Sequence, residues 1–190
     1  MKTIVTITTI ATILTIATID VFAQAKIGDV TLPATIVSGN ENLVYNGGGI
    51  RKKYFMSMYV GALYLKQKSA DAAKIVAADE PMAMRIHIVS GLITSKRMEE
   101  SIHEGFEKST NGNMAPLKDK IDDFISVFRE EIKVNDEFDL VYVPKEGVKI
   151  LKNNQQKKVI AGLDFKNALF GIWLGNNPVD TDLKQKLMGK

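Results

Sequence analysis

The residues best suited to chemistry follow a run of three glycines. Glycines at 47–49 lead through one isoleucine into the triple cation Arg51-Lys52-Lys53. Glycines let the backbone turn sharply or approach a neighbouring segment closely. In a strand, Arg51 and Lys53 share one face and Lys52 takes the other. A buried arginine requires an anionic partner, and both an internal carboxylate and the carboxylate of a ligand fit this pattern.

Other common catalytic and metal-binding patterns are absent. The 190 residues include no Cys and two His, and carry a net charge of +3. The lack of Cys excludes a disulfide, a thiolate metal site and a Cys nucleophile. Two His argue against a multi-His metal site, and we predict no metal or cofactor. His87 and His103 are isolated, and we interpret both as structural. The absence of a dense Lys/Arg run argues against nucleic-acid binding.

The N-terminal 23 residues have the pattern of a secretory signal peptide. Met1-Lys2 is positively charged, Thr3 to Ile19 is uncharged, and Val21-Phe22-Ala23 fits a cleavage site. We expect cleavage after Ala23, with an uncleaved membrane anchor as the competing interpretation. Residues 24–190 then form one exported domain, periplasmic or extracellular, without stable membrane insertion.

The order of the expected elements indicates an α+β fold. A short apolar piece at 43–45 precedes the glycines, and Asn153-Asn154 is an expected turn. Hydrophobic periodicity predicts strands at 30–37, 54–65, 82–88, 138–143, 148–151 and 157–163, and helices at 70–78, 95–110, 116–128, 165–174 and 178–187. Strands come first, helices lie in the middle, and strands and helices follow. A large antiparallel sheet with helices layered on one face suits this order.

Two long blocks resemble one known family. The segment from Gly47 to Leu65, GGGIRKKYFMSMYVGALYL, and the segment from Phe165 to Leu183, FKNALFGIWLGNNPVDTDL, resemble the chalcone isomerase-like family in its bacterial branch. The resemblance covers essentially all of residues 24–190. It implies an open-faced β-sandwich, a large antiparallel sheet covered by a layer of helices, with a ligand cleft between them. The family includes plant enzymes that close a chalcone to a flavanone, fatty-acid-binding relatives and bacterial proteins.

The resemblance transfers few catalytic residues. Arg51 matches the family's arginine after the glycines, and Tyr59 aligns with a catalytic threonine. Ile93 and Glu100 align with a catalytic tyrosine and asparagine, and Ile172 aligns with a serine or threonine. Only Arg51 keeps the family's residue type. We therefore treat Arg51, Tyr59, Glu100 and Ile172 as candidate ligand-binding residues and assign no catalytic residue.

Three functions remain open. The leading hypothesis is a non-catalytic protein that binds a small apolar acid such as a fatty acid, with Arg51 as anion anchor and Tyr59 as second donor. The alternatives are an intramolecular lyase/isomerase acting on a chalcone-like ketone, and a structural envelope module without a ligand. Glu100 is a further candidate for the internal partner of Arg51. Phe106, Phe124, Phe128, Phe170 and Trp173 either line the apolar part of the cleft or fill the core.

Overall fold

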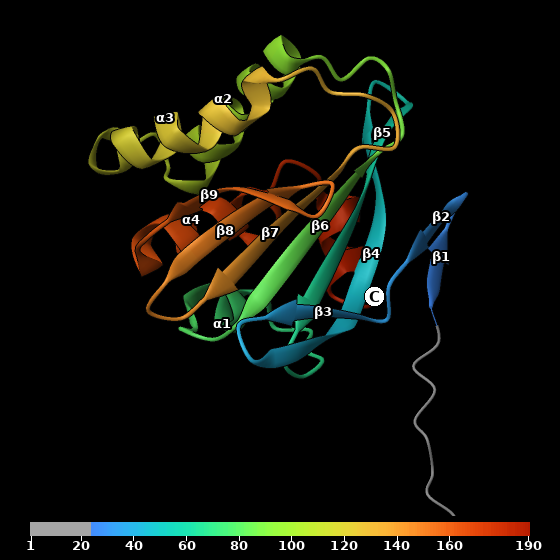
Figure 1. Cartoon of the computed structure of the whole chain (residues 1–190), viewed down its shortest axis with the longest axis horizontal. Coiled ribbons are helices and arrows are strands. Elements are labelled where there is room, and N and C mark those ends of the chain that lie inside the picture. The colour runs from blue at the N-terminus through green and yellow to red at the C-terminus, as the bar shows by residue number, and fades with distance from the viewer. Residues whose placement is uncertain (1–23) are drawn as a thin grey trace, which may run out of the picture.

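A seven-stranded antiparallel sheet forms the centre of the molecule (Figure 1). The computed structural model describes residues 24–190, and the predicted signal peptide at 1–23 lies outside the described residues. Each strand pairs with the next one in the chain, in the order β3-β4-β5-β6-β7-β8-β9. The strands are β3 (Thr35–Ser38), β4 (Glu41–Lys53), β5 (Met56–Leu65), β6 (Met82–Ile88), β7 (Glu137–Val143), β8 (Gly147–Lys152) and β9 (Gln155–Ile160). The α+β prediction is confirmed.

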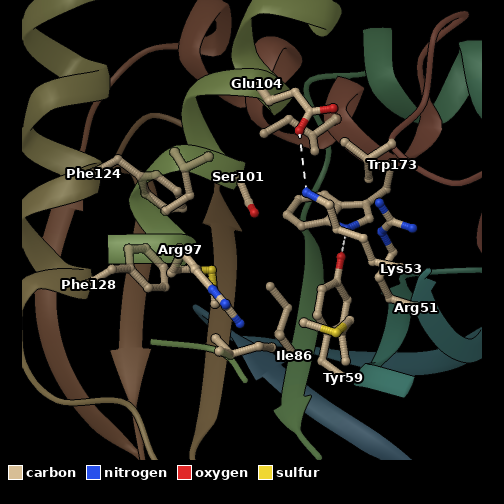
Figure 2. Close-up of a pocket in the computed structure, with 16 residues that line it drawn as sticks. Arg51, Lys53, Tyr59, Ile86, Arg97, Ser101, Glu104, Phe124, Phe128 and Trp173 are labelled. Atoms are coloured by element: carbon tan, nitrogen blue, oxygen red, sulfur yellow. Dashed lines mark hydrogen bonds and ion pairs between the residues drawn. The ribbon is translucent and has the colours of Figure 1, made fainter. Parts of the chain in front are cut away.

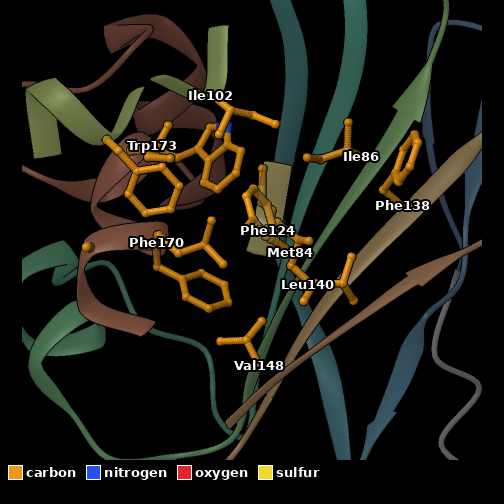
Figure 3. Close-up of a cluster of buried hydrophobic side chains, with 14 of the residues drawn as sticks. Met84, Ile86, Ile102, Phe124, Phe138, Leu140, Val148, Phe170 and Trp173 are labelled. Carbon is orange, nitrogen blue, oxygen red and sulfur yellow. The ribbon is translucent and has the colours of Figure 1, made fainter. Parts of the chain in front are cut away.

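The helices cover one face of this sheet. They are α1 (Ala72–Ala77), α2 (Ser95–Ser109), α3 (Lys118–Ser126), α4 (Leu163–Leu174) and α5 (Thr181–Leu187), with short 3-10 turns at Ala115–Leu117 and Val127–Arg129 on either side of α3. Alternate residues of β6 and β7, including Met84, Ile86 and Leu140, face the helices. They pack with aromatic residues of α3 and α4 into the main core (Figure 3). The pattern is that of a half-covered sheet, with apolar residues at every second position.

The opposite face carries a smaller apolar cluster. The two-stranded hairpin β1 (Ala25–Ile27) and β2 (Val30–Leu32) packs there, against residues of β4, β5 and β6. Tyr64 is fully buried in this cluster and donates a hydrogen bond to the carbonyl of Pro33 over 3.0 Å. Among residues 24–190, no helix is long and apolar enough to cross a membrane.

The structure corrects three predicted element boundaries. The expected edge strand at 30–37 is two strands, β2 and β3, which are separated at Pro33-Ala34 because proline lacks the N–H that a ladder needs. The glycines lie inside β4, which runs on from the apolar piece at 43–45. Tyr54 and Phe55 form the turn before β5 and are not part of the strand.

The glycines allow helix α5 to approach strand β4. A Cβ atom on Gly47 would lie 2.2 Å from the carbonyl oxygen of Lys186, and one on Gly49 would lie 2.6 Å from a Lys186 side-chain carbon. Larger residues would push α5 away from the sheet. The close approach brings Asp180, the N-cap of α5, to Arg51 at the other end of the glycine run.

Candidate functional site

A pocket opens between the sheet and the helices (Figure 2). It encloses about 100 Å³, with strands β4, β5 and β6 on one side and α2, α3 and α4 on the other. The lining is mostly apolar and aromatic, with charged residues at one end. It consists of Arg51, Lys53, Met58, Tyr59, Ile86, Ile93, Arg97, Met98, Ser101, Ile102, Glu104, Phe124, Phe128, Ile172, Trp173 and Val179. Such a lining suits a ligand with an apolar body and one polar end.

Strand pairing places Arg51 beside Tyr59. The two residues are directly opposite each other in the β4–β5 ladder, so their side chains share the face that the helices cover. One residue further along, the register shifts: Lys52 pairs with Ser57, which leaves Met58 as the extra residue of a β-bulge. A bulge re-aims nearby side chains, and this one turns Met58 into the pocket wall.

Arg51 has an internal partner, and that partner is Asp180. Nη1 of Arg51 lies 3.1 Å from Oδ2 of Asp180, and it also donates to the carbonyl of Lys52. Both side chains of the ion pair are largely buried, with 19% and 13% exposed. Burial raises the pKa of Asp180, but the backbone amides of Leu183 and Lys52 and the charge of Arg51 outweigh it, so the pKa lies below the ordinary value.

Arg51 keeps unused donors despite this ion pair. Within residues 24–190, every hydrogen bond of its guanidinium starts at Nη1, which leaves Nε and Nη2 available. An arginine fork can hold a carboxylate through two parallel N–H donors. The geometry therefore accommodates both partners that the sequence left open. Asp180 is the internal carboxylate, and Nε and Nη2 can bind the carboxylate of a ligand.

Tyr59 offers a second donor to the pocket. Its hydroxyl oxygen accepts a hydrogen bond from Nε1 of Trp173 at 2.8 Å (Figure 2). No acceptor for the Tyr59 proton occurs among the described residues. Burial raises the pKa of Tyr59, although the Trp173 hydrogen bond and the charge of Arg51 oppose the shift. The phenol thus stays protonated at neutral pH and can donate to an oxygen of a ligand.

The polar end of the pocket carries an excess of positive charge. Lys53 lies 3.8 Å from Glu104, and Glu104 is also 2.9 Å from Lys108 outside the pocket. Arg97 is exposed and donates to the carbonyl of Leu92 at 3.1 Å. The three lining cations Arg51, Lys53 and Arg97 thus stand against two carboxylates, Glu104 and the Arg51 partner Asp180. This balance favours an anionic group at the entrance.

Of the four predicted site residues, the structure brings three together. Arg51, Tyr59 and Ile172 line the pocket. Glu100 does not: it lies on the exposed face of α2, and the internal partner of Arg51, for which Glu100 was one candidate, is Asp180. The reason is helical geometry, since the stripe of α2 that faces the sheet contains Met98, Ile102 and Phe106 instead.

The five predicted lining aromatics divide into two groups. Phe124, Phe128 and Trp173 line the pocket. Phe106 and Phe170 are buried in the core, where Phe106 stacks on Phe165 with ring centres 5.7 Å apart.

Sequence reasoning missed the other charged residues of the pocket. Lys53 was placed correctly on the face of Arg51, but its role at the entrance was not foreseen. Arg97 and Glu104 belong to a helix rich in charged residues, and Asp180 is the N-cap of α5, so no sequence pattern distinguishes them from ordinary surface or capping residues. A basic residue in the first turn of α2, where the helix dipole favours acids, was the one available signal for Arg97.

Metal ligation has no candidate in the described part of the chain. Residues 24–190 contain no group of three His, Asp or Glu residues arranged to hold a metal ion. The two predicted structural histidines differ: His103 is exposed, while Nδ1 of His87 lies 3.1 Å from Glu137.

The comparisons with known proteins agree with the fold. A protein-family model described as chalcone isomerase-like matches residues 24–189. The crystal structure of a fatty-acid binding protein from Arabidopsis thaliana is similar, with a TM-score of 0.67 and 18% sequence identity. The match covers 84% of this chain and 92% of the plant protein. A search among curated protein sequences gives no significant match.

Proposed function

Because this chain belongs to the chalcone isomerase-like family, we propose that it binds a small apolar carboxylic acid, such as a fatty acid, in the pocket between sheet and helices. The observation that carries the proposal is the pair of available donors, Arg51 and Tyr59, at an apolar cavity. A ligand carboxylate can accept from both donors, and such charge-assisted hydrogen bonds are stronger than those between neutral groups. The similar plant protein is by its name a fatty-acid binding protein, which supports the same ligand class.

The size of the cavity indicates that its walls move when a ligand binds. A volume of about 100 Å³ is smaller than the roughly 150 Å³ cavity that accepts benzene in an engineered protein. A long acyl tail therefore requires the walls to move. Met58 and Met98 line the cavity, and the unbranched, flexible methionine side chain adapts easily to new shapes. The proposal thus places the tail between β5, β6 and α2, with Met58 and Met98 displaced.

A ligand pair that differs only in charge tests the proposal. Dodecanoate and dodecanol have the same tail, and only the first has a carboxylate. The chain contains a single tryptophan, Trp173, which lines the pocket and bonds to Tyr59, so its fluorescence reports binding directly. We expect dodecanoate to bind at least tenfold more tightly than dodecanol, the factor that about one charge-assisted hydrogen bond contributes.

Conservative variants assign this preference to individual donors. Arg51→Gln should abolish the preference for dodecanoate, because it removes the charge. Tyr59→Phe should weaken dodecanoate binding several-fold through loss of one O–H donor. The matched control is Tyr64→Phe, which removes a buried phenol on the opposite face and should leave binding unchanged. Equal affinity for dodecanoate and dodecanol in the unmodified protein contradicts the proposal.

The same donors favour one second candidate. A neutral Tyr59 hydroxyl beside Arg51 can stabilise the oxygen of an enolate, as an intramolecular lyase/isomerase of a chalcone-like ketone needs. Chalcone closure above the solution rate, lost in Arg51→Gln, would establish that activity. Closure at the solution rate leaves binding as the function.

We propose that the protein acts outside the cytoplasm. The support is the sequence of residues 1–23, with its charged start, uncharged stretch and small residue at Ala23. Expression of the full chain and N-terminal sequencing of the exported product should give a first residue of Gln24. A product that starts at Met1 and stays with the membrane fraction identifies an uncleaved anchor.

A further inference from the structure

The tip of the β4–β5 hairpin exposes three large apolar side chains in a row. Tyr54 is 79% exposed, Phe55 is fully exposed and Met56 is 44% exposed. Lys53 pairs with Met56 in the ladder, so Tyr54 and Phe55 are the two central residues of a tight turn. Aromatic rings at a projecting tip contribute nothing to the core.

The backbone of this turn is unfavourable for its residues. Both Tyr54 and Phe55 have positive φ, 49° and 66°. Two-residue hairpin turns with positive φ at both positions strongly favour Asn-Gly or Asp-Gly, and a bulky residue in this region is strained. Folding alone therefore gives no reason for aromatic residues here, and such local strain is typical of functional positions.

Further apolar residues gather at the same end of the sheet. Strand β5 begins at this end, β6 finishes there and β7 begins there, because Tyr59 pairs with Ile88 and His87 pairs with Glu137. Figure 1 shows the connections before α2 and before β7 passing this end of β5. These connections carry the exposed Leu92 and Val134. Five of the seven exposed large hydrophobic residues in the described part of the chain lie at this end, namely Tyr54, Phe55, Met56, Leu92 and Val134.

Basic residues surround this apolar group. Lys52 precedes the tip, and Lys96 and Arg97 begin α2, whereas the neighbouring Arg51 and Lys53 are in ion pairs with Asp180 and Glu104. The carboxylates of the neighbouring connection are in ion pairs: Glu130 with Lys157, Glu131 with Lys133, and Asp136 with Lys152. Lys52 is exposed and forms no ion pair within residues 24–190. The end of the sheet thus presents aromatic side chains inside a basic rim.

We propose that this end of the sheet, with Tyr54 and Phe55 at its tip, docks on an anionic lipid surface. Aromatic rings are favourable at the boundary between headgroups and acyl chains, and lysine and arginine are attracted to anionic headgroups. Two aromatic side chains bury about 150–250 Å² each, well below the roughly 800 Å² per partner of a stable protein interface. A projecting tip of this size fits insertion into a lipid surface better than docking on a protein.

Docking would bring the pocket to the lipid surface. Arg51, Lys53 and Met58 belong to the same hairpin and line the pocket. An apolar acid could then pass between the bilayer and the pocket without crossing water. This step rests on the proposed function, whereas the docking itself depends only on the hairpin and its charges.

Co-sedimentation with vesicles tests the docking. The full chain is expressed, the exported protein is purified, and its binding to phosphatidylcholine vesicles with and without phosphatidylglycerol is compared. We expect binding that requires phosphatidylglycerol and weakens with salt. Phe55→Ser should lower the partition coefficient about tenfold or more, and Lys52→Gln should lower it several-fold on anionic vesicles. Val159→Ser, which removes an exposed apolar side chain from β9, is the matched control and should have no effect.

A turn variant separates docking from folding. Replacing Tyr54-Phe55 by Asn-Gly supplies the residues that the turn prefers, so thermal stability should rise while vesicle binding is lost. A structural role for the aromatic residues predicts the reverse, a fall in stability. Equal sedimentation of this variant and the unmodified protein overturns the proposal, as does a concentration-dependent dimer that Phe55→Ser abolishes. Dodecanoate titration of the same variant should remain unchanged, which distinguishes failure of docking from failure of the binding function.

Discussion

Two arginine–aspartate pairs lie on opposite faces of one sheet and differ in how completely the arginine is used. Arg85 on β6 holds Asp139 on β7 through two bonds of 2.7 Å, from Nε to Oδ1 and from Nη2 to Oδ2. Its third nitrogen, Nη1, lies 3.5 Å from Glu137. Arg51 on β4 has only Nη1 engaged, to Asp180 and to the carbonyl of Lys52.

The surroundings of the two pairs explain the difference. Arg85 and Asp139 are directly opposed neighbours in the ladder, so their side chains meet at ideal spacing on the face away from the helices. Asp180 is held in place by helix α5, because its Oδ1 accepts a hydrogen bond from the amide of Leu183 at 3.0 Å. Only its other oxygen, Oδ2, bonds to Arg51. A fully used fork is a structural element, whereas a partly used fork beside a cavity can receive a ligand.

The largest expected effect is on stability, and it belongs to Arg85. Arg85→Ala leaves the carboxylate of Asp139 buried without its partner, and removal of one member of a buried pair costs about 3–5 kcal/mol. Arg51→Ala should cost only about 1 kcal/mol, because Asp180 keeps its bonds to backbone amides. Urea unfolding of both variants measures the two losses.

Ligand binding should show the opposite order in the same two variants. Arg85→Ala, studied where it is still folded, should bind dodecanoate normally, and Arg51→Ala should not. Comparable losses of stability, with no change in binding for Arg51→Ala, would instead identify Arg51 as purely architectural. That outcome favours the structural envelope module among the three functions.

A third buried cation, Lys166 on α4, differs from the two arginines because its charge makes the free energy of unfolding depend on pH. It is fully buried, and its ammonium donates to the carbonyls of Ile75, Val76 and Ala78 at 2.7–3.0 Å. Burial lowers the pKa of Lys166 to about 8, below the value of about 10.4 in an unfolded chain. Between these values the unfolded chain binds more protons, so the free energy of unfolding should rise with pH.

The rise should amount to about 1 kcal/mol between roughly pH 8 and pH 9. This range ends about one unit below the ordinary tyrosine pKa of about 10, so the tyrosines whose pKa burial raises oppose the rise only slightly. Urea unfolding across the range measures the slope, and Lys166→Met, which fills a similar volume without a charge, should flatten it. A slope that persists in Lys166→Met assigns the effect to other groups.

Patterns within one segment predicted most of the fold. The alternation of Met82, Met84, Ile86 and Ile88 gave the bounds of β6, and the predicted helix at 95–110 matches α2 to within one residue. The stripe of Met98, Ile102 and Phe106 is buried, as its spacing of four predicted. These features depend on neighbours in the chain, and residue spacing records them directly.

Contacts between distant segments were harder to predict. Asp180 is 129 positions from Arg51, and its helical cap pattern gives no sign of a second task. The glycine run signalled a close approach, but the approaching helix could not be identified without the packing of α5 on β4. The turn at Tyr54-Phe55 was missed because its residues are those of a strand, and local preference was overridden by the β4–β5 register.

The smallest expected effect is a change in ligand affinity, and it distinguishes Asp180 from Asp139. In Asp180→Asn, the side-chain oxygen still caps α5, since asparagine is as good an N-cap as aspartate. Arg51 then lacks its internal counter-charge, so a ligand carboxylate becomes its main partner. We expect dodecanoate to bind about fivefold more tightly, equivalent to about 1 kcal/mol, with dodecanol unaffected. Asp139→Asn on the other face should change neither affinity. A weaker affinity for dodecanoate in Asp180→Asn would mean that Asp180 orients Arg51 toward the ligand and does not compete with it.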